Sequence, residues 1–311
     1  METRRVGSLE VSVAGLGCNN FGMRIDEAAS KAVVDAALDV GINHFDTANI
    51  YGGGKSEEFL GRALGSRRAD AVITTKVGAG VPEGEAGGSE SLIHRACDES
   101  LARLGTDYID LYVLHVPDET TPIGETLAAF AKLIAAGKVR EIGCSNFTGP
   151  MLEAADAAAA ELGVPRFVNA QNDYSLLNRA VEDDVIPACQ QLDIVLMPYF
   201  PLASGVLTGK YTKGQPHPEG TRLAAWGPMA ETFASDEKFD VVDRLAEYAE
   251  AHGHTLPELA LSWLAGAPTV GSVIAGATSP EQVRANAAAT AAWVLTAEER
   301  AEVDVLARVG G

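Results

Sequence analysis

The chain has few cysteines, few basic residues and no long apolar run. Its four cysteines, Cys18, Cys97, Cys144 and Cys189, are widely separated and form no CxxC pair. This spacing argues against a disulfide framework and against a zinc site, and the residues also contain no HExxH pattern. We therefore predict no metal site, and we expect the cysteines to be small core residues.

Positive charge is scarce. The 311 residues include 24 lysines and arginines against 43 aspartates and glutamates, which gives a formal net charge of -19. Such a chain has no general attraction for nucleic acid or for an anionic membrane, so we expect neither as a partner. An anionic ligand would have to bind in a local basic cavity.

Apolar segments are short throughout. No stretch approaches the roughly 18 uninterrupted apolar residues of a membrane span. Residues 1–8 carry charges with no apolar segment behind them, so they do not resemble a secretory leader. The sequence predicts a soluble, cytoplasmic protein.

Short apolar runs alternate with amphipathic helical patterns along the chain. A small hairpin over 3–13 precedes the strands predicted at 13–18, 42–46, 71–76, 109–115, 139–144, 166–170, 194–197 and 272–275. Helices are predicted at 26–40, 56–65, 89–104, 123–136, 148–162, 180–191, 236–252, 255–266, 279–290 and 296–308. Strands separated by helices predict a parallel sheet, and this many units predict its closure. We predict an α/β fold, a (β/α)8 TIM barrel with an N-terminal hairpin and extra C-terminal helices. No linker or repeat divides residues 1–311, so we predict one domain.

One segment breaks the alternation. Residues 201–236 are rich in glycine and proline and show no helical or strand period. A loop of this length in a barrel is usually a lid or a binding loop. Trp226 lies in it, either as packing or as a substrate contact.

Four residue types with complementary chemistry fall at or just after three predicted neighbouring strands. They are Asp46, Tyr51, Lys76 and His115. In a barrel these strand ends meet at one face. An ammonium group can stabilise the tyrosinate and lower its pKa, and a carboxylate can keep that ammonium charged. The set predicts general acid catalysis on a carbonyl, with Tyr51 as the acid and His115 binding the oxygen.

These motifs resemble those of the aldo-keto reductase family over nearly the whole chain. The similar segments are 41–48 with Tyr51, 75–78, and 103–112 leading to His115. The resemblance implies a (β/α)8 barrel that transfers a hydride from NADPH to an aldehyde or ketone, with the same four residues as a catalytic tetrad. Residues 199–211 resemble the branch that includes potassium-channel β subunits.

The resemblance also implies a cofactor site. Ser145, Asn146 and Gln171 would hold the nicotinamide carboxamide and Tyr199 would stack on the ring, while the other implied contacts are Phe200, Pro201, Leu202, Lys210, Arg222, Gly276, Thr278, Gln282 and Asn286. Phe200 replaces the usual serine of that branch. Gly276 stands where well-known members have a lysine for the 2′-phosphate. NADPH selectivity would then depend on Arg222, Gln282 and Arg284, and NADH is the alternative cofactor.

Two other functions remain open at this stage. A barrel aldolase would use Lys76 as a Schiff base, although Asp46 should keep that lysine cationic. A cofactor-binding regulatory or redox-sensing subunit with slow turnover would keep the same residues. The carbonyl substrate, the direction of the reaction in the cell and the oligomeric state are not determined by the sequence.

Overall fold

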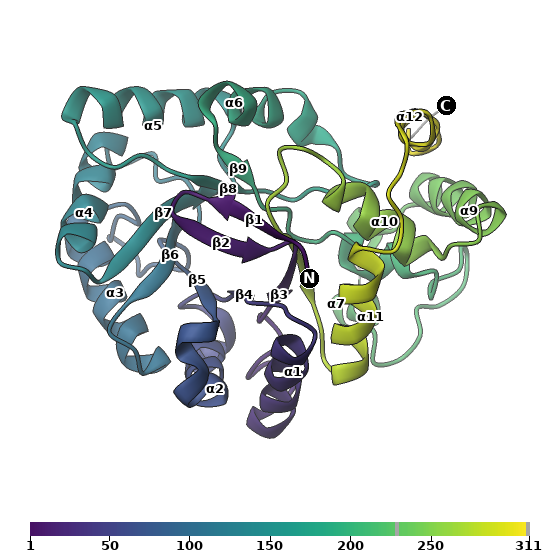
Figure 1. Cartoon of the computed structure of the whole chain (residues 1–311), viewed down its shortest axis with the longest axis horizontal. Coiled ribbons are helices and arrows are strands. Elements are labelled where there is room, and N and C mark those ends of the chain that lie inside the picture. The colour runs from purple at the N-terminus through teal and green to yellow at the C-terminus, as the bar shows by residue number, and fades with distance from the viewer. Residues whose placement is uncertain (228–229, 309–311) are drawn as a thin grey trace.

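The computed structural model describes residues 1–227 and 230–308. Figure 1 shows short strands at the centre of the molecule and helices around them. Among the described residues, none of the helices combines the length and apolarity needed to cross a bilayer.

Within the described residues, eight strands form one parallel sheet in the order β10-β3-β4-β5-β6-β7-β8-β9. The strands are β3 (Ala14–Gly17), β4 (His44–Asp46), β5 (Val72–Val77), β6 (Ile109–Leu114), β7 (Val139–Ser145), β8 (Asn169–Gln171), β9 (Val195–Leu196) and β10 (Val273–Gly276). Parallel bridges join Leu196 to Val270 and Tyr199 to Ile274, so β9 and the residues after it meet β10 and the residues before it. The predicted (β/α)8 TIM barrel is confirmed.

Helices cover the outside of this sheet. They are α1 (Glu27–Asp39), α2 (Lys55–Leu64), α3 (Glu90–Leu104), α4 (Ile123–Ala135), α5 (Gly149–Leu162), α6 (Val185–Leu192), α7 (Arg222–Trp226), α8 (Ala230–Phe233), α9 (Asp236–Ala251), α10 (Leu256–Ala265), α11 (Pro280–Thr290) and α12 (Ala297–Leu306), with short 3-10 turns η1 (Tyr51–Gly54), η2 (Gly65–Asp70), η3 (Ala180–Glu182) and η4 (Ala203–Thr208). Capping boxes at Thr255 and Thr296 start α10 and α12, because each threonine and the glutamate three residues later satisfy orphan N–H groups of the first turn.

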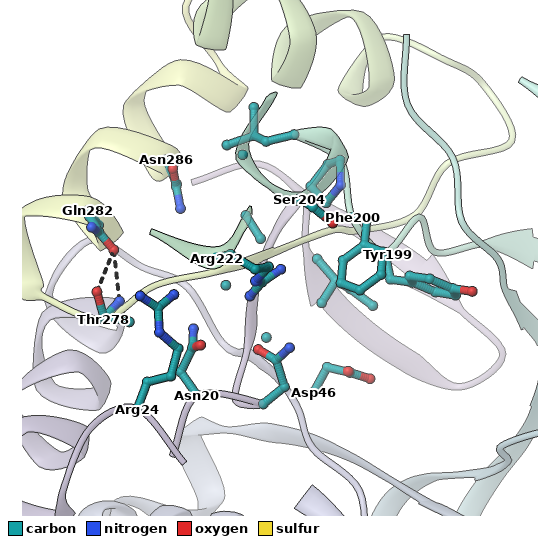
Figure 2. Close-up of a pocket in the computed structure, with 18 of the residues that line it drawn as sticks. Asn20, Arg24, Asp46, Tyr199, Phe200, Ser204, Arg222, Thr278, Gln282 and Asn286 are labelled. Atoms are coloured by element: carbon teal, nitrogen blue, oxygen red, sulfur yellow. Dashed lines mark hydrogen bonds between the residues drawn. The ribbon is translucent and has the colours of Figure 1, made fainter. Parts of the chain in front are cut away.

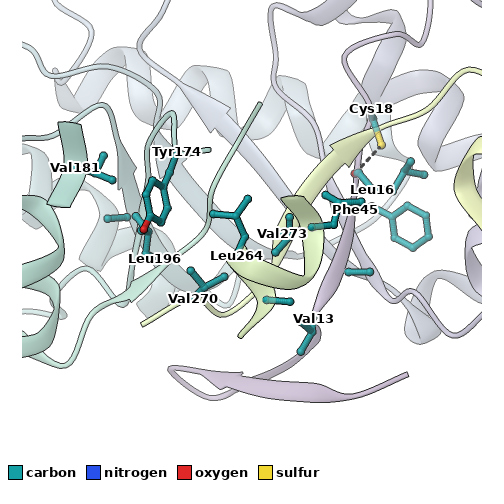
Figure 3. Packing of buried hydrophobic residues seen from close by; sticks show 14 of the residues in the cluster. Val13, Leu16, Cys18, Phe45, Tyr174, Val181, Leu196, Leu264, Val270 and Val273 are labelled. Atoms are coloured by element: carbon teal, nitrogen blue, oxygen red, sulfur yellow. Dashed lines mark hydrogen bonds between the residues drawn. The ribbon is translucent and has the colours of Figure 1, made fainter. Parts of the chain in front are cut away.

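Apolar side chains fill the space between sheet and helices. Figure 3 shows Leu16, Phe45 and Val273, from three adjacent strands, packed with Leu264 of α10. Each of these side chains is at most 2% exposed. Burying such a side chain contributes roughly 1.5 to 3 kcal/mol, so this layer fixes the positions of the strands.

The predicted N-terminal hairpin, β1 (Thr3–Val6) and β2 (Leu9–Ser12), is present. Figure 1 shows it lying across one end of the barrel. Val6, Leu9 and Val11 pack into the barrel interior with Leu111 and other strand residues. The hairpin therefore closes the N-terminal end of the strands, and a cavity can open only at the opposite end.

Three predicted segments differ from the structure. The helix predicted at 180–191 is instead the 3-10 turn η3 followed by α6. The strand predicted at 166–170 is β8, which covers Asn169–Gln171. The segment 201–236 is not a featureless loop, because it contains η4, α7 and α8. These helices are too short to show a helical period, and α7 starts where the Thr221 hydroxyl caps the N–H of Ala224. The side chain of Trp226 lies outside the described residues, so its role stays a prediction.

A histidine lies inside the barrel on the same face of β4 as Asp46. His44 is fully buried, with its Nδ1 2.8 Å from Ser272 Oγ and its Nε2 3.0 Å from Thr74 Oγ1. Gly15 makes room for this ring, because a Cβ there would be 2.8 Å from Nδ1. Burial lowers the pKa of His44 to about 4 from 6.5. The imidazole is therefore neutral at pH 7.

This burial predicts an acid-sensitive fold. Between pH 6.5 and pH 4 the unfolded chain binds a proton at His44 that the folded chain does not, so the free energy of unfolding falls as the pH falls. The loss due to His44 should be about 3 kcal/mol at pH 4. Urea unfolding should show that the free energy of unfolding falls less between pH 7 and pH 4 in His44→Gln than in wild type. The surface variant His252→Gln should keep the wild-type dependence, and equal slopes for all three proteins would contradict the prediction.

Candidate active site

The C-terminal ends of the strands open into a cavity of about 830 Å3. The exposed Arg284, predicted to contribute to NADPH selectivity, does not line it, but the other residues predicted for catalysis or cofactor binding do: Asp46, Tyr51, Lys76, His115, Ser145, Asn146, Gln171, Tyr199, Phe200, Pro201, Leu202, Lys210, Arg222, Gly276, Thr278, Gln282 and Asn286. The structure thus brings together residues that are up to 240 positions apart in the chain, from Asp46 to Asn286. Their roles in catalysis and cofactor binding stay predictions.

A buried ion pair forms the floor of the cavity. The Nζ of Lys76 donates to both carboxylate oxygens of Asp46 at 2.7 Å and to the carbonyl of Thr47 at 2.7 Å. Gln171 donates to Asp46 Oδ2 at 3.0 Å. Burial lowers the pKa of Lys76, but the charge of Asp46 and its hydrogen bonds outweigh burial and leave that pKa raised. Lys76 is therefore an ammonium ion at neutral pH.

Glycines place Tyr51 beside this pair. Gly52, Gly53 and Gly54 have φ of 60°, 65° and 92°, in the left-handed region that glycine adopts readily. A Cβ on Gly52 would be 2.9 Å from the carbonyl oxygen of Phe21. The turn therefore needs glycine on both counts, and it leaves Lys76 Nζ 5.3 Å from the centre of the Tyr51 ring.

His115 completes the group. Its main-chain N–H donates to the carbonyl of Val77 at 2.7 Å, and its ring meets that of Tyr51 edge to face with centroids 5.8 Å apart. Burial, and after it the charge of Lys76, lowers the pKa of His115 to about 4. The neutral ring has a buried Nδ1 with no hydrogen-bond partner among the described residues.

The pKa of Tyr51 differs from the sequence-based expectation. We predicted that Lys76 lowers this pKa; the lysine acts in that direction, but burial raises the pKa more, and the net direction is upward. The phenol thus keeps its proton at neutral pH. The expectation failed because sequence spacing identifies charged neighbours but does not measure how far a group is removed from water.

Polar groups of β7, β8 and β9 line the next part of the cavity. Ser145 pairs with Gln171 across the strands. Asn146 has a left-handed φ of 63°, and its Nδ2 donates to the carbonyl of His115 at 3.0 Å. Tyr199 Oη donates to Asn146 Oδ1 at 2.7 Å. The Tyr199 ring is thereby held in one orientation at the cavity wall.

The segment after β9 has unusual backbone geometry. Phe200, Ala203 and Ser204 have φ of 53°, 46° and 59° although none of them is glycine. Strain of this kind costs on the order of 1 to 3 kcal/mol per residue and concentrates at functional sites. The hydroxyl of Ser204 is buried at the cavity and has no partner among the described residues. Lys210 lies against the same turn, because a Cβ on Gly205 would be 2.9 Å from its Nζ.

The far end of the cavity is lined by α7 and by α11 with the turn before it. Figure 2 shows Thr278, Gln282 and Asn286 on one side, Tyr199 and Phe200 on the other, and Arg222 between them. The Arg222 guanidinium lies 5.5 Å from the centre of the Phe200 ring. Thr278 donates its main-chain N–H to Gln282 Oε1 at 2.8 Å.

Several lining residues were not predicted from the sequence. They are Gly17, Asn19, Asn20, Arg24, Ser204, Gly205, Thr208, Glu219, Gly220, Thr221, Ile274 and Ala275. Asn19, Asn20 and Arg24 follow the first barrel strand, so the rule that directs attention to strand ends could have found them. Glu219 to Thr221 lie in the long segment 201–236, which has no periodic signal.

A closed parallel barrel with a buried lysine-carboxylate pair, a tyrosine and a histidine gathered at its strand ends has the arrangement of a barrel enzyme's active site. The chain belongs to the aldo/keto reductase family: the sequence profile of that family matches residues 14–308. It is therefore an oxidoreductase of a family that acts on small carbonyl compounds with a nicotinamide cofactor.

Similar proteins cover nearly the whole chain. A probable voltage-gated potassium channel subunit beta of Arabidopsis thaliana is 36% identical over 92% of this chain and 90% of its own length. The L-glyceraldehyde 3-phosphate reductase of Escherichia coli K12 is 33% identical over 92% of this chain and 86% of its own. The holo form of an aldo-keto reductase from Bacillus halodurans superposes with a TM-score of 0.80 at 33% identity, over 100% of this chain and 97% of that one.

The ion pair predicts a specific stability defect. Asp46→Asn leaves the ammonium of Lys76, which is 2% exposed, without a counter-ion. The free energy of unfolding at pH 7 should fall by about 3 to 5 kcal/mol. It should partly recover at alkaline pH, because the buried Lys76 can then lose its proton.

Urea unfolding of Asp46→Asn, Lys76→Met and the double variant measures this effect. The double variant should be more stable than Asp46→Asn, because no uncompensated charge remains. Glu90→Gln is the matched control, since this exposed carboxylate pairs with the exposed Lys132 and its loss should leave the free energy of unfolding close to the wild-type value. An Asp46→Asn protein as stable as wild type would contradict the prediction.

Proposed function

We propose that this protein reduces an aldehyde or ketone to the alcohol with NADPH, with Tyr51 as the general acid. The observation that carries the proposal is that Tyr51, His115 and the Asp46–Lys76 pair meet in one cavity. The same cavity contains amide, hydroxyl and guanidinium groups suited to a dinucleotide. Its volume of about 830 Å3 lies in the upper part of the range for ligand sites.

The residues present fit a nicotinamide cofactor. Ser145, Asn146 and Gln171 offer hydrogen-bonding groups for a carboxamide, and Tyr199 offers a ring for stacking. The buried hydroxyl of Ser204, which lacks a partner among the described residues, and the nearby Lys210 suit a pyrophosphate. Phe200, Pro201 and Leu202 would contribute main-chain groups and wall, and Gly276, Thr278 and Asn286 would line the adenosine end.

The chemistry of the chain follows from these positions. When bound, the cofactor supplies the hydride. Tyr51 holds its proton at neutral pH and donates it to the carbonyl oxygen, while neutral His115 orients that oxygen through a ring N–H. Lys76 stabilises the phenolate that remains, and Asp46 keeps Lys76 charged. Each group thus has one task in a single proton transfer.

Fluorescence titration with NADPH and NADH, followed by an aldehyde and ketone panel, tests the proposal. Short hydroxyaldehydes should be included because one relative is called L-glyceraldehyde 3-phosphate reductase. Saturable binding with steady NADPH oxidation supports it. Absence of nucleotide binding would contradict it.

A regulatory subunit is the second candidate, because two plant relatives are called probable potassium channel subunits beta. Such a protein would bind the cofactor and turn over slowly. Rapid turnover with a simple aldehyde excludes it as the main role. A Schiff-base aldolase is disfavoured, because hydrogen bonds to Asp46 and Thr47 hold Lys76 as an ammonium ion.

A cytoplasmic location belongs to the same proposal. The four cysteines are free and buried, as expected for a reducing compartment.

Replacing Tyr51 by phenylalanine tests the general acid. Turnover should fall by roughly 100- to 10,000-fold, because the phenolic proton is lost, while the NADPH dissociation constant stays nearly unchanged. Tyr248→Phe, which removes a surface hydroxyl bonded to Glu302, is the control and should keep full activity. Undiminished turnover in Tyr51→Phe would refute the assignment.

Replacing Arg222 by alanine tests cofactor selectivity. NADPH binding should weaken by about 1.5 to 3 kcal/mol, the range for a charged hydrogen bond, and NADH binding should change little. Lys210→Ala should weaken both cofactors, because both carry the pyrophosphate. Dissociation constants from fluorescence titration decide the point. If Arg222→Ala affects both cofactors equally, then this arginine does not distinguish them.

A further inference from the structure

The cavity is locally basic although the chain is strongly acidic. Its lining contains the cations Arg24, Lys76, Lys210 and Arg222 and the carboxylates Asp46 and Glu219. Asp46 and Lys76 neutralise each other in the floor. The remaining positive charge therefore lies away from Tyr51, toward α7 and α11, where it can attract an anion despite the net charge of -19.

Arg24 enters this region from a different segment of the chain than Arg222. It lies in the loop between β3 and α1, and its Nη2 donates to the carbonyl of Gly220 at 2.7 Å. Gly220 is two residues before Arg222, the first residue of α7. The loop after the first strand and the segment before α7 are thus joined at the cavity by one arginine.

The two guanidinium groups lie close enough to repel each other. Figure 2 shows both reaching into the same part of the cavity, beside Thr278 and Gln282. Burial lowers the pKa of Arg222, and the charge of Arg24 lowers it further. An anion bound between the two arginines would remove this repulsion. The planar guanidinium fork also matches phosphate oxygens better than an ammonium group does.

We propose that Arg24 and Arg222 together clamp a phosphate monoester, the 2′-phosphate of the dinucleotide, and that Arg24 is the second determinant of selectivity for it. This inference rests on the proposed function. Arg24 reaches the site from the loop after the first strand and Arg222 from the segment that precedes α9, so the phosphate would be held from both sides. The Gly220 carbonyl keeps Arg24 in place.

Two small nucleotides isolate the phosphate. Adenosine 2′,5′-bisphosphate and adenosine 5′-monophosphate differ only in the 2′-phosphate and need no nicotinamide. Dissociation constants for both are measured by calorimetry on wild type, Arg24→Met, Arg24→Lys and Lys31→Met. Lys31 is the matched control, because it is an exposed cation on α1 whose partner is Asp35. Circular dichroism confirms that each variant is folded.

Arg24→Met should raise the dissociation constant of the bisphosphate by about 10- to 50-fold, which is the scale of one charge-assisted hydrogen bond. The monophosphate should change by less than about twofold, since it lacks the group that Arg24 contacts. Arg24→Lys should lie between wild type and Arg24→Met because lysine keeps the charge but not the fork. Lys31→Met should match wild type.

Other results would overturn the inference. If Arg24→Met weakens the binding of both nucleotides equally, Arg24 only holds the segment at Gly220. If it weakens the binding of neither, Arg24 does not contact the bound nucleotide. The two proposals fail separately. If NADPH binds and Arg24→Met leaves bisphosphate affinity intact, the clamp is wrong and the reductase proposal stands. If wild type binds neither NADPH nor the bisphosphate, both the reductase proposal and the clamp proposal are wrong.

Discussion

The arrangement of the cavity depends on the buried contact between Lys76 and Asp46. Both side chains are at most 6% exposed, and removing two charges from water costs several kcal/mol for each. Hydrogen bonds from Lys76 to both carboxylate oxygens and to Thr47, with a further one from Gln171, offset that cost. These bonds link β4, β5 and β8. The relative positions of three strand ends are therefore fixed by one electrostatic requirement.

Around this rigid floor, the chain accepts backbone strain. The described non-glycine residues with positive φ include Asn146, Phe200 and Ser204, and all three line the cavity. Each conformation is costly for an L-residue, and it persists because the surrounding barrel is well packed. Asn146 shows the benefit, since its side chain joins the carbonyl of His115 to the hydroxyl of Tyr199. Strain is thus concentrated where polar groups must point inward together.

The sequence predicted the features that follow from hydrophobic periodicity and from polar residues at strand ends. Buried runs such as Ile109–Leu114 gave the barrel, and polar residues at their ends gave the floor of the cavity. Arg24 was not predicted although it follows the first barrel strand, and its contact with Gly220, 196 positions away, has no local sequence pattern. The predicted direction for the pKa of Tyr51 was also wrong, because desolvation depends on the whole surrounding shell. The short helices in 201–236 were not predicted, because a helix of two turns or fewer is too short to show a hydrophobic period.

Closure of the sheet has a consequence for synthesis of the chain. The first barrel strand, β3, pairs with β4 on one side and with β10 on the other, and β10 begins at Val273. While the ribosome makes the residues between them, β3 keeps an exposed edge, which is a site for wrong pairing with other nascent chains. The hairpin side chains Val6 and Leu9 also cannot complete their packing until Ile274 has been synthesised, because Ile274 belongs to the same cluster. The early edge therefore needs protection until β10, which begins at Val273, has been synthesised.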